Sequence, residues 1–239
     1  VRDVSFEVRR GEVLGVSGLV GSGRTELLRA IFGADRAESG DVSVAGAPPR
    51  RFREPREAVR AGLGMIPEDR KTEGLLLPRS ILMNLTLGRL RPFRSRVGLI
   101  NGRRERAEAV EVGRRVHLKC DSVEQPVEQL SGGNQQKVVV GRWLLRDPDV
   151  VLFDEPTRGI DVAAKFAVYA LIDELVGRGK GVVIVSSEVE ELMLVCDRIA
   201  VTSAGRLVET FQRGEWTHEN LLAAAFRGYA NTIDEAQAR

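Results

Sequence analysis

Residues 18–25 read Gly-Leu-Val-Gly-Ser-Gly-Arg-Thr, and this stretch gives the first strong indication of the fold class. The apolar run 13–16 before it predicts a buried strand, and Leu27, Leu28 and Ile31 after it fall on one helix face. Two glycines with four residues between them, followed by a basic and a hydroxyl residue, match the spacing of a phosphate-binding loop. The segment therefore predicts a strand, a phosphate-binding turn and a helix.

Each part of this loop has a chemical reason. Glycines allow successive backbone N–H groups to point toward phosphate oxygens, and the N-terminus of the following helix adds partial positive charge. Thr25 can place its hydroxyl on Mg²⁺, whereas Arg24 stands where lysine is usual. Arginine keeps the charge but is longer, planar and forked, so it is not an equivalent substitute. An ordinary glycine-rich turn stays open as the alternative from this segment alone.

A pair of acids, Asp154-Glu155, directly follows the apolar run 150–153. Four consecutive apolar residues are typical of a strand buried on both faces of a parallel sheet. Ligands of open α/β sheets gather outside the carboxyl ends of the strands. Asp154 is therefore expected to hold Mg²⁺ through water, and Glu155 to orient or deprotonate an attacking water. The alternative is two acids in a surface loop.

The remaining pattern predicts an α/β protein with a parallel sheet, because apolar strands alternate with helical segments. Residues from about 80 to 130 contain few strand signals and are expected to form a helical insertion. Strands are expected at 4–8, 41–44, 181–185, 199–203 and 206–211, and helices at 103–116, 137–145, 163–176, 188–195 and over the last 28 or so residues. Residues 63–66 are a short apolar run that ends at Pro67.

Composition excludes several classes of protein. Apolar residues make up 43% and charged residues 29%, which excludes disorder, collagen and a disulfide scaffold. The net charge of +2 by itself supports neither a nucleic acid nor an anionic membrane as partner. No apolar run approaches the roughly 20 residues of a membrane span, and no signal peptide is recognisable. The chain begins at Val1 without Met, which indicates a piece of a longer polypeptide.

Several candidates have a plain structural interpretation. The arginines at 89–106 could bind nucleic acid, but Phe93 is the only aromatic residue near them, so a solvated helical face is favoured and no nucleic acid is expected as partner. Cys120 and Cys196 lie far apart without metal-ligand spacing and are expected to be inert thiols. The two histidines, at 117 and 218, have no partner at ligand spacing.

The heptad Leu-Ser-Gly-Gly-Asn-Gln-Gln at 130–136 resembles the signature motif of ATP-binding cassette (ABC) ATPases, and it lies just upstream of the acidic strand as in that family. The resemblance implies a P-loop NTPase fold with a RecA-like core, an antiparallel β edge subdomain and a helical subdomain. It implies one domain over 1–239, with its core at about 1–79 and 131–239 and the helical subdomain at about 80–130.

The resemblance also implies roles for single residues, with ATP and Mg²⁺ as cofactors. Catalysis would fall to Glu155 and to Ser187 at the switch position, with Thr25 and Asp154 as metal ligands. Glu68 falls near the Q-loop position, and Gly159 and Asp161 in the D-loop. The nucleotide-binding set would be Gly18, Gly21, Ser22, Gly23, Arg24, Thr25 and Glu26, and the signature, acting on a partner's ATP, would be Leu130, Ser131, Gly132, Gly133, Asn134 and Gln135.

A narrower likeness concerns the second cassette of monosaccharide importer ATPases of the ribose, galactose and xylose type. It is carried by the segments 18–26, 66–71, 130–137, 154–161 and 185–188. It implies that the chain is the C-terminal half of a two-cassette protein on the cytoplasmic face of the cell membrane. Implied partners are a second cassette, a transmembrane permease that would contact residues 72–87, and indirectly a periplasmic or lipoprotein sugar-binding protein.

Three positions depart from the family pattern. Arg24 replaces the Walker A lysine, Glu68 replaces the Q-loop glutamine and Ser187 replaces the switch histidine. The chain's own ATP site is therefore expected to be weak or slow, while its signature completes the partner's site. A nucleotide-binding module that hydrolyses little is the alternative, and a soluble ABC protein acting on ribosomes or DNA is a further one.

Overall fold

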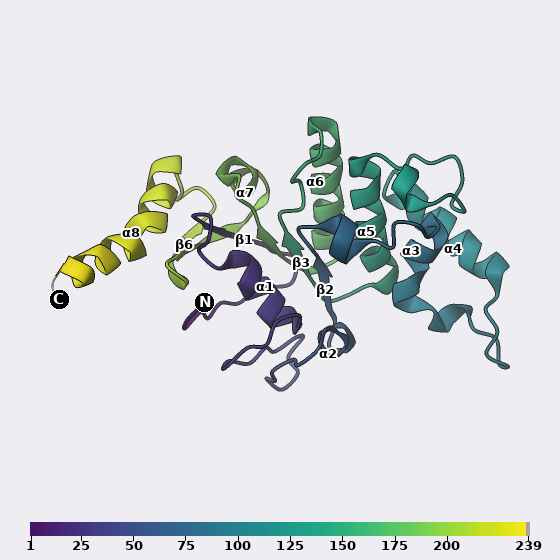
Figure 1. Cartoon of the computed structure of the whole chain (residues 1–239), viewed down its shortest axis with the longest axis horizontal. Helices are drawn as coiled ribbons and strands as arrows, with labels where there is room; N and C mark the ends of the chain where they lie inside the picture. Colours follow the sequence, from purple (N-terminus) through teal and green to yellow (C-terminus); the bar gives the residue numbers. More distant parts are fainter. Residues whose placement is uncertain (238–239) are drawn as a thin grey trace. The chain divides into compact units, whose positions relative to one another are not determined.

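The computed structural model describes residues 1–237, with side chains through Tyr229. The chain divides into two compact parts. The first part comprises Val1–Met65, Asp149–Glu155 and the chain from Val176 onward, and the second part comprises Ile66–Pro148 and Pro156–Leu175. Most helices and strands of both parts are labelled in Figure 1. The domain limits expected from the resemblance stay a prediction.

A six-stranded sheet forms the centre of the first part, with strand order β2-β3-β4-β1-β5-β6. The apolar runs form its parallel strands: β1 lies between β4 and β5, and β3 pairs in parallel with β4. β6 runs antiparallel to β5 at the edge of the sheet. The strand bounds are Val13–Gly18 (β1), Leu63–Ile66 (β2), Val150–Asp154 (β3), Gly181–Val185 (β4), Arg198–Ser203 (β5) and Arg206–Gln212 (β6).

This topology brings three strand ends to one edge of the sheet. In the register, Asp154 at the end of β3 lies beside Val185 at the end of β4. Gly18 at the end of β1 lies beside Thr202 of β5. The loops that follow β1, β3 and β4 therefore leave the sheet at the same end, the carboxyl end of its parallel strands.

Two expected strands, at 4–8 and 41–44, are wrong. Residues 4–8 alternate between half-buried and exposed, as a strand would, but they belong to no ladder of the described sheet. Residue 42 makes a single antiparallel bridge to Arg50. The bridge cannot extend into a ladder toward the turn between its two residues, because Pro48 and Pro49 have no N–H to donate. The alternation of apolar and polar residues at 4–8 therefore predicted correctly which side chains are buried, but it predicted wrongly that the backbone pairs with a neighbouring strand.

Helices of the first part lie against the sheet or beside it. They are α1 (Arg24–Phe32), α2 (Pro55–Arg60), α7 (Val189–Val195) and α8 (His218–Gln237). α1 is preceded by Gly23, whose backbone is left-handed, and followed by Gly33, which caps the last carbonyls. The close approach of α7 to β1 needs Gly15, because a Cβ there would lie 2.7 Å from Cys196 Sγ.

The second part is mainly helical. Its elements are a π-helical turn η1 (Arg70–Gly74), α3 (Ile81–Thr86), the short 3₁₀ turns η2 (Leu87–Arg89), η3 (Arg91–Phe93) and η4 (Val127–Gln129), α4 (Gly102–Arg115), α5 (Gly132–Arg146) and most of α6 (Val162–Gly177). Asn84, fully buried, ties α3 to its neighbours. Its side-chain amide accepts from the N–H of Leu76 and donates to three carbonyls, and Arg142 of α5 donates to its backbone oxygen at 2.8 Å.

The α/β architecture with a phosphate-loop core is confirmed, and so is the helical character of the segment after residue 80. No helix among the described residues is both long enough and apolar enough to cross a lipid bilayer.

Candidate functional site

The loop between β1 and α1 needs glycine at three positions, for two different reasons. A Cβ at Gly18 would lie 2.5 Å from the carbonyl oxygen of Thr202, so no side chain fits there. Gly21 and Gly23 have φ of 80° and 91°, a region that other residues rarely adopt. The predicted phosphate loop is therefore a tight turn with an irregular backbone that ends at the first turn of α1.

A hydroxyl chain braces this loop from behind. The hydroxyls of Ser22 and Thr202 are hydrogen-bonded at 3.0 Å, and Thr202 donates to the carbonyl of Ser17 at 3.0 Å. Both hydroxyl residues are buried. Sequence reasoning did not identify Thr202, because its role depends on β5 lying beside β1. Glu26, in the first turn of α1, is exposed.

Arg24 folds back over the loop. Its side chain is buried, with one guanidinium nitrogen donating to the carbonyl of Gly18 and the other 3.6 Å from Glu155 Oε1. Both side chains of this ion pair are about one-tenth exposed, at 8% and 10%. Burial lowers the pKa of Arg24, and the carboxylate of Glu155 opposes this. Arg24, at the position where lysine is usual, is therefore bound to the Gly18 carbonyl and the Glu155 carboxylate.

Thr25 and Asp154 meet at the expected metal position. The Thr25 hydroxyl donates to Asp154 Oδ1 at 3.0 Å. Burial raises the pKa of Asp154 to about 6, although the hydrogen bond from Thr25 lowers it. A buried carboxylate that resists ionisation is one that a cation would stabilise, and a hydroxyl with a carboxylate is an oxygen donor set that suits Mg²⁺.

Glu155 has a strained backbone, with φ of 45°. Its N–H donates to the carbonyl of Val185 at 2.9 Å, which fixes the turn after β3 against the end of β4. Ser187 donates from its hydroxyl to Glu155 Oε2 at 3.0 Å. Strained residues concentrate at functional positions. Both carboxylate oxygens of Glu155 therefore have a partner, and the two partners are Arg24 and Ser187.

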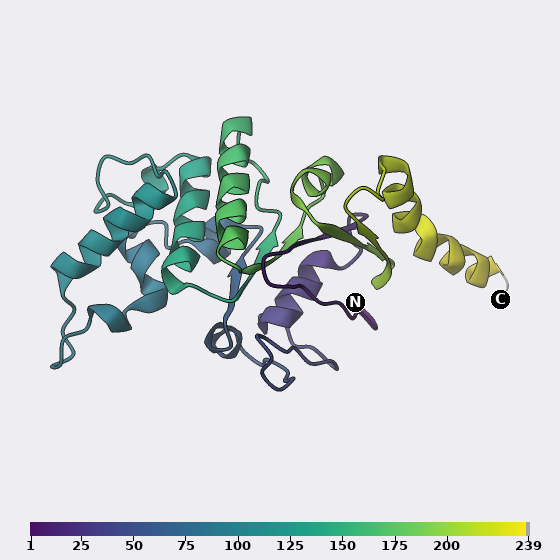
Figure 2. The same cartoon turned by 180° about the vertical axis from the view of Figure 1, so that it is seen from behind.

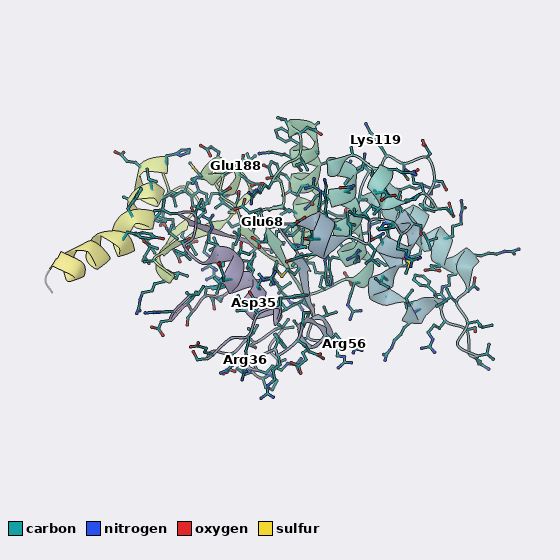
Figure 3. The ribbon with its side chains drawn as sticks, in the orientation of Figure 1. Asp35, Arg36, Arg56, Glu68, Lys119 and Glu188 are labelled. Carbon is teal, nitrogen blue, oxygen red and sulfur yellow. The ribbon has the colours of Figure 1, made fainter. Side chains whose placement is uncertain are left out.

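The second part of the chain contains the predicted Q-loop, signature and D-loop residues. Glu68, labelled in Figure 3, follows β2 and forms an ion pair with Arg158. Arg70 donates to the carbonyl of Arg158 at 3.3 Å. The segment after β2 and the segment before α6 are thus joined by two arginines. Both arginines lie in segments that carry the family likeness, but no role was predicted for either, because their partners are distant in the chain.

The serine of the heptad caps α5. Ser131 Oγ accepts from the backbone N–H of Asn134 at 3.4 Å and from its side chain at 3.1 Å. The Asn134 side-chain oxygen in turn accepts from the N–H of Lys119. Gln135 is buried and donates to Val127, while its Oε1 has no partner among the described residues. Leu130 is half-buried just before the cap.

The two glycines of the heptad allow close packing. A Cβ at Gly132 would lie 2.7 Å from Arg70 Nη2, and one at Gly133 would lie 2.6 Å from the Cβ of Ala164 in α6. Asp161 caps α6, because its side chain accepts from the N–H of Ala164 at 2.9 Å. Gly159, two residues earlier, has φ of 69°. The predicted signature and D-loop residues therefore lie at the N-termini of two packed helices.

A cavity of about 430 Å³ lies beside this cap. Burial raises the pKa of the Cys120 thiol in its wall. The lining residues are Leu118, Lys119, Cys120, Asp121, Gln125, Gln129, Leu130, Ser131 and Asn134.

The predicted site residues thus form two groups. The first part gathers the loop 18–25 with Asp154, Glu155 and Ser187, and the second part gathers Glu68, the heptad and the D-loop residues. Among the residues described, no group of three or more histidine, cysteine or acidic side chains is placed to hold a metal ion by itself. The arrangement defines a nucleotide-binding domain of the phosphate-loop class.

The chain belongs to the ABC transporter family, whose model matches residues 1–158. Membership of this family implies that the chain binds ATP.

Curated relatives carry the likeness over nearly the whole chain. One is the putative ribose/galactose/methyl galactoside import ATP-binding protein 1 of Rhizobium meliloti, 47% identical over 98% of this chain and 46% of the relative. Another is the ribose import ATP-binding protein RbsA 3 of Rubrobacter xylanophilus, 48% identical over 94% of this chain and 45% of the relative. The xylose import ATP-binding protein XylG of Geobacillus kaustophilus is 45% identical over 95% of this chain and 45% of the relative. The chain therefore spans about half the length of these relatives.

Solved structures share the fold. The dimeric structure of MJ0796, a bacterial ABC transporter cassette, matches with a TM-score of 0.73 at 25% identity over 89% of this chain and 90% of that chain. A nucleotide-free ATP-binding cassette from an ABC transporter matches with a TM-score of 0.76 at 23% identity over 92% of this chain and 87% of that chain.

Proposed function

We propose that this chain is an ATP-binding and ATP-hydrolysing cassette of an importer for a monosaccharide. The observation that carries the proposal is the meeting of Thr25 with Asp154, at 3.0 Å, beside the glycine loop and Glu155. A hydroxyl at the end of a phosphate loop and a carboxylate beside it are the groups that bind the Mg²⁺ of a nucleoside triphosphate.

The residues present fit both cofactors. Gly18, Gly21, Ser22 and Gly23 would offer backbone N–H groups to the phosphates of ATP, with Arg24 and Glu26 at the start of α1. Thr25 and Asp154 would hold Mg²⁺, which when bound supplies positive charge for the phosphate oxygens. Glu155, at the end of β3, would orient the water that attacks the terminal phosphate.

The second group of residues would act on a neighbour. We place Leu130, Ser131, Gly132, Gly133, Asn134 and Gln135 at the ATP of a partner cassette, where the N-terminus of α5 would face the phosphates. Gly159 and Asp161 would form the D-loop contact between cassettes, and Glu68 would stand at the Q-loop position. The dimeric cassette MJ0796 supports pairing of this kind.

The sugar and the other partners rest on the curated relatives, whose names state import of ribose, galactose or xylose. This chain spans about half of each relative, and its segments 18–26, 66–71 and 130–137 resemble the second cassette. We therefore propose that it is the C-terminal half of a two-cassette protein. It would act on the cytoplasmic face of the membrane with a permease, which would contact residues 72–87, and indirectly with a sugar-binding protein.

One observation favours a second candidate function, a nucleotide-binding module that hydrolyses little. Arg24 and Ser187, two of the three departures from the family pattern, both contact the carboxylate of Glu155. A carboxylate held on both oxygens is less available to take a proton from water. Ser187 also lacks the imidazole that the family uses to contact the terminal phosphate.

Phosphate release by the 239-residue chain separates the two functions. Turnover well above that of Glu155→Gln supports the hydrolysing cassette. Binding of ATP without turnover, with turnover rescued by an added partner cassette, supports the module. A titration with ATP, with and without Mg²⁺, supplies the binding constant, and Thr25→Ala should weaken binding only when Mg²⁺ is present.

Restoring variants test the cause of slow hydrolysis. If contacts to Glu155 limit the reaction, Arg24→Lys with Ser187→His should raise turnover by about tenfold or more. Lys71→Arg, outside the loop and exposed, serves as the control. Turnover that stays unchanged in the double variant would assign the slowness to another cause.

A further inference from the structure

The loop between η3 and α4, residues 93–101, presents apolar side chains to solvent. Val97 is 81% exposed, Leu99 71% and Ile100 43%. In Figures 1 and 2 this loop extends away from the helices on either side of it. Three neighbouring aliphatic side chains at the end of a protruding loop are an unusual use of apolar residues in an otherwise polar segment.

The backbone holds these side chains in place. Arg94 and Ile100 form an antiparallel bridge, and the N–H of Ser95 donates to the carbonyl of Leu99 at 2.8 Å. The base of the loop is fixed by Phe93, which is buried, and by a bond from the N–H of Asn101 to the carbonyl of Phe93 at 2.7 Å. The apolar tip is therefore a built hairpin, ready to bind without further ordering of the backbone.

Positive charge surrounds the tip. Between residues 87 and 104 the sequence contains six arginines and no acidic residue, in a chain whose basic and acidic residues nearly balance at 36 and 34. Arg89 is used internally, because it donates to the carbonyl of Leu145 at 2.6 Å. The other five are exposed and form no ion pair within the described residues: Arg91, Arg94, Arg96, Arg103 and Arg104.

We propose that this hairpin and its arginines bind the surface of an anionic phospholipid bilayer. Exposed aliphatic residues enter the boundary between headgroups and acyl chains, while arginines pair with the lipid phosphates. A nucleic acid would use the arginines but would gain nothing from Val97 and Leu99. A single strand would also stack its bases on exposed aromatic rings, and the one aromatic residue of the loop, Phe93, is buried. A duplex would pair its phosphates with the arginines and leave the exposed aliphatic residues without a role.

The proposal is independent of the ATP site, since it involves other residues and is tested without nucleotide. The experiment measures co-sedimentation of the 239-residue chain with vesicles of phosphatidylcholine alone or mixed with phosphatidylglycerol. We expect binding to the mixed vesicles only, and weaker binding at higher salt because screening reduces the attraction. Arg94→Gln with Arg96→Gln should weaken binding by about 25-fold, from about fivefold per arginine.

The apolar half of the proposal has its own variant. Val97→Ser with Leu99→Ser should weaken binding by about tenfold or more without changing the charge. Two matched pairs on other elements should leave binding unchanged: Arg56→Gln with Arg60→Gln on α2, where Arg56 is labelled in Figure 3, and Leu194→Ser with Leu222→Ser. Circular dichroism of each variant checks that the fold is retained.

Three results would overturn the proposal. The first is equal binding to vesicles with and without phosphatidylglycerol. The second is a loss of binding in the control pairs as large as in the loop variants. The third is binding of an RNA oligonucleotide, but not of vesicles, that depends on Arg94 and Arg96 and not on Val97 and Leu99, which would assign the loop to nucleic acid.

Discussion

The ion pair between Arg24 and Glu155 makes a quantitative prediction about the nucleotide-free protein. The two groups are 3.6 Å apart and their side chains are only 8% and 10% exposed. At an effective dielectric constant of about 20, two unit charges at this distance attract by about 5 kcal/mol before desolvation is considered. Desolvation removes part of this, in line with the lowered pKa of Arg24. We therefore expect a coupling energy of about 2–3 kcal/mol.

A double-mutant cycle measures this coupling. Arg24→Met, Glu155→Gln and the double variant would be unfolded with urea without nucleotide, and the free energies of unfolding compared. The double variant should lose less stability than the sum of the single variants, because each single variant leaves one buried charge unpaired.

The control cycle uses a pair of the same charge type at the surface. Arg206 and Asp3 are 3.2 Å apart, but their side chains are 58% and 81% exposed. Arg206→Gln with Asp3→Asn should give a coupling energy near zero. If the two cycles gave the same coupling energy, the argument that Arg24 is bound to Glu155 in the resting site would be refuted.

Three further predictions concern stability and reactivity. Gly133→Ala should lower the free energy of unfolding by about 1–3 kcal/mol, because its Cβ would lie 2.6 Å from the Cβ of Ala164. The control Gly177→Ala, whose Cβ would meet nothing within 4 Å, should lower it by less than about 0.5 kcal/mol. Urea unfolding that ranks the two variants the other way would contradict the packing argument. The pKa of Asp154 is raised to about 6, against 3.8, so the native state holds this proton to a higher pH than the unfolded state does, and the free energy of unfolding should fall as the pH rises from about 4 to about 6. The Asp154→Asn variant should not show this fall when unfolding is measured over a pH series. An unchanged pH dependence in the variant would argue against a buried protonated Asp154. Cys196 is fully buried, whereas Cys120 is only partly buried, so a thiol reagent should label Cys120 in the native protein and Cys196 only after unfolding. Equal labelling rates would contradict the packing around Cys196.

The parallel strands could be predicted because their burial is visible in the sequence. Apolar runs at 13–16, 150–153 and 181–185 became β1, β3 and β4, since strands covered on both faces need no polar positions. The segment 4–8 failed for the opposite reason. Its alternation describes which side chains are buried, and no periodicity can tell whether a neighbouring backbone is present to pair with.

Motif spacing located the candidate site residues, but it could not supply their contacts. Thr25 and Asp154 were expected to share a metal, and the structure brings the two together. Arg24 can reach Glu155 because only β4 lies between β1 and β3 in the sheet. This order of strands cannot be read from the motif. The support given by Thr202 to Ser22 likewise depends on the neighbouring strand β5.

The most direct test is a titration of the isotope-labelled chain with ATP and Mg²⁺, in which the amide NMR signals of residues 18–25 and 131–134 are followed. We predict large shifts for Gly21, Gly23 and Thr25 in the chain alone, and shifts for Ser131 and Gly132 only after a partner cassette is added. Shifts confined to residues 131–134, with residues 18–25 unaffected, would contradict the assignment of the triphosphate to the glycine loop.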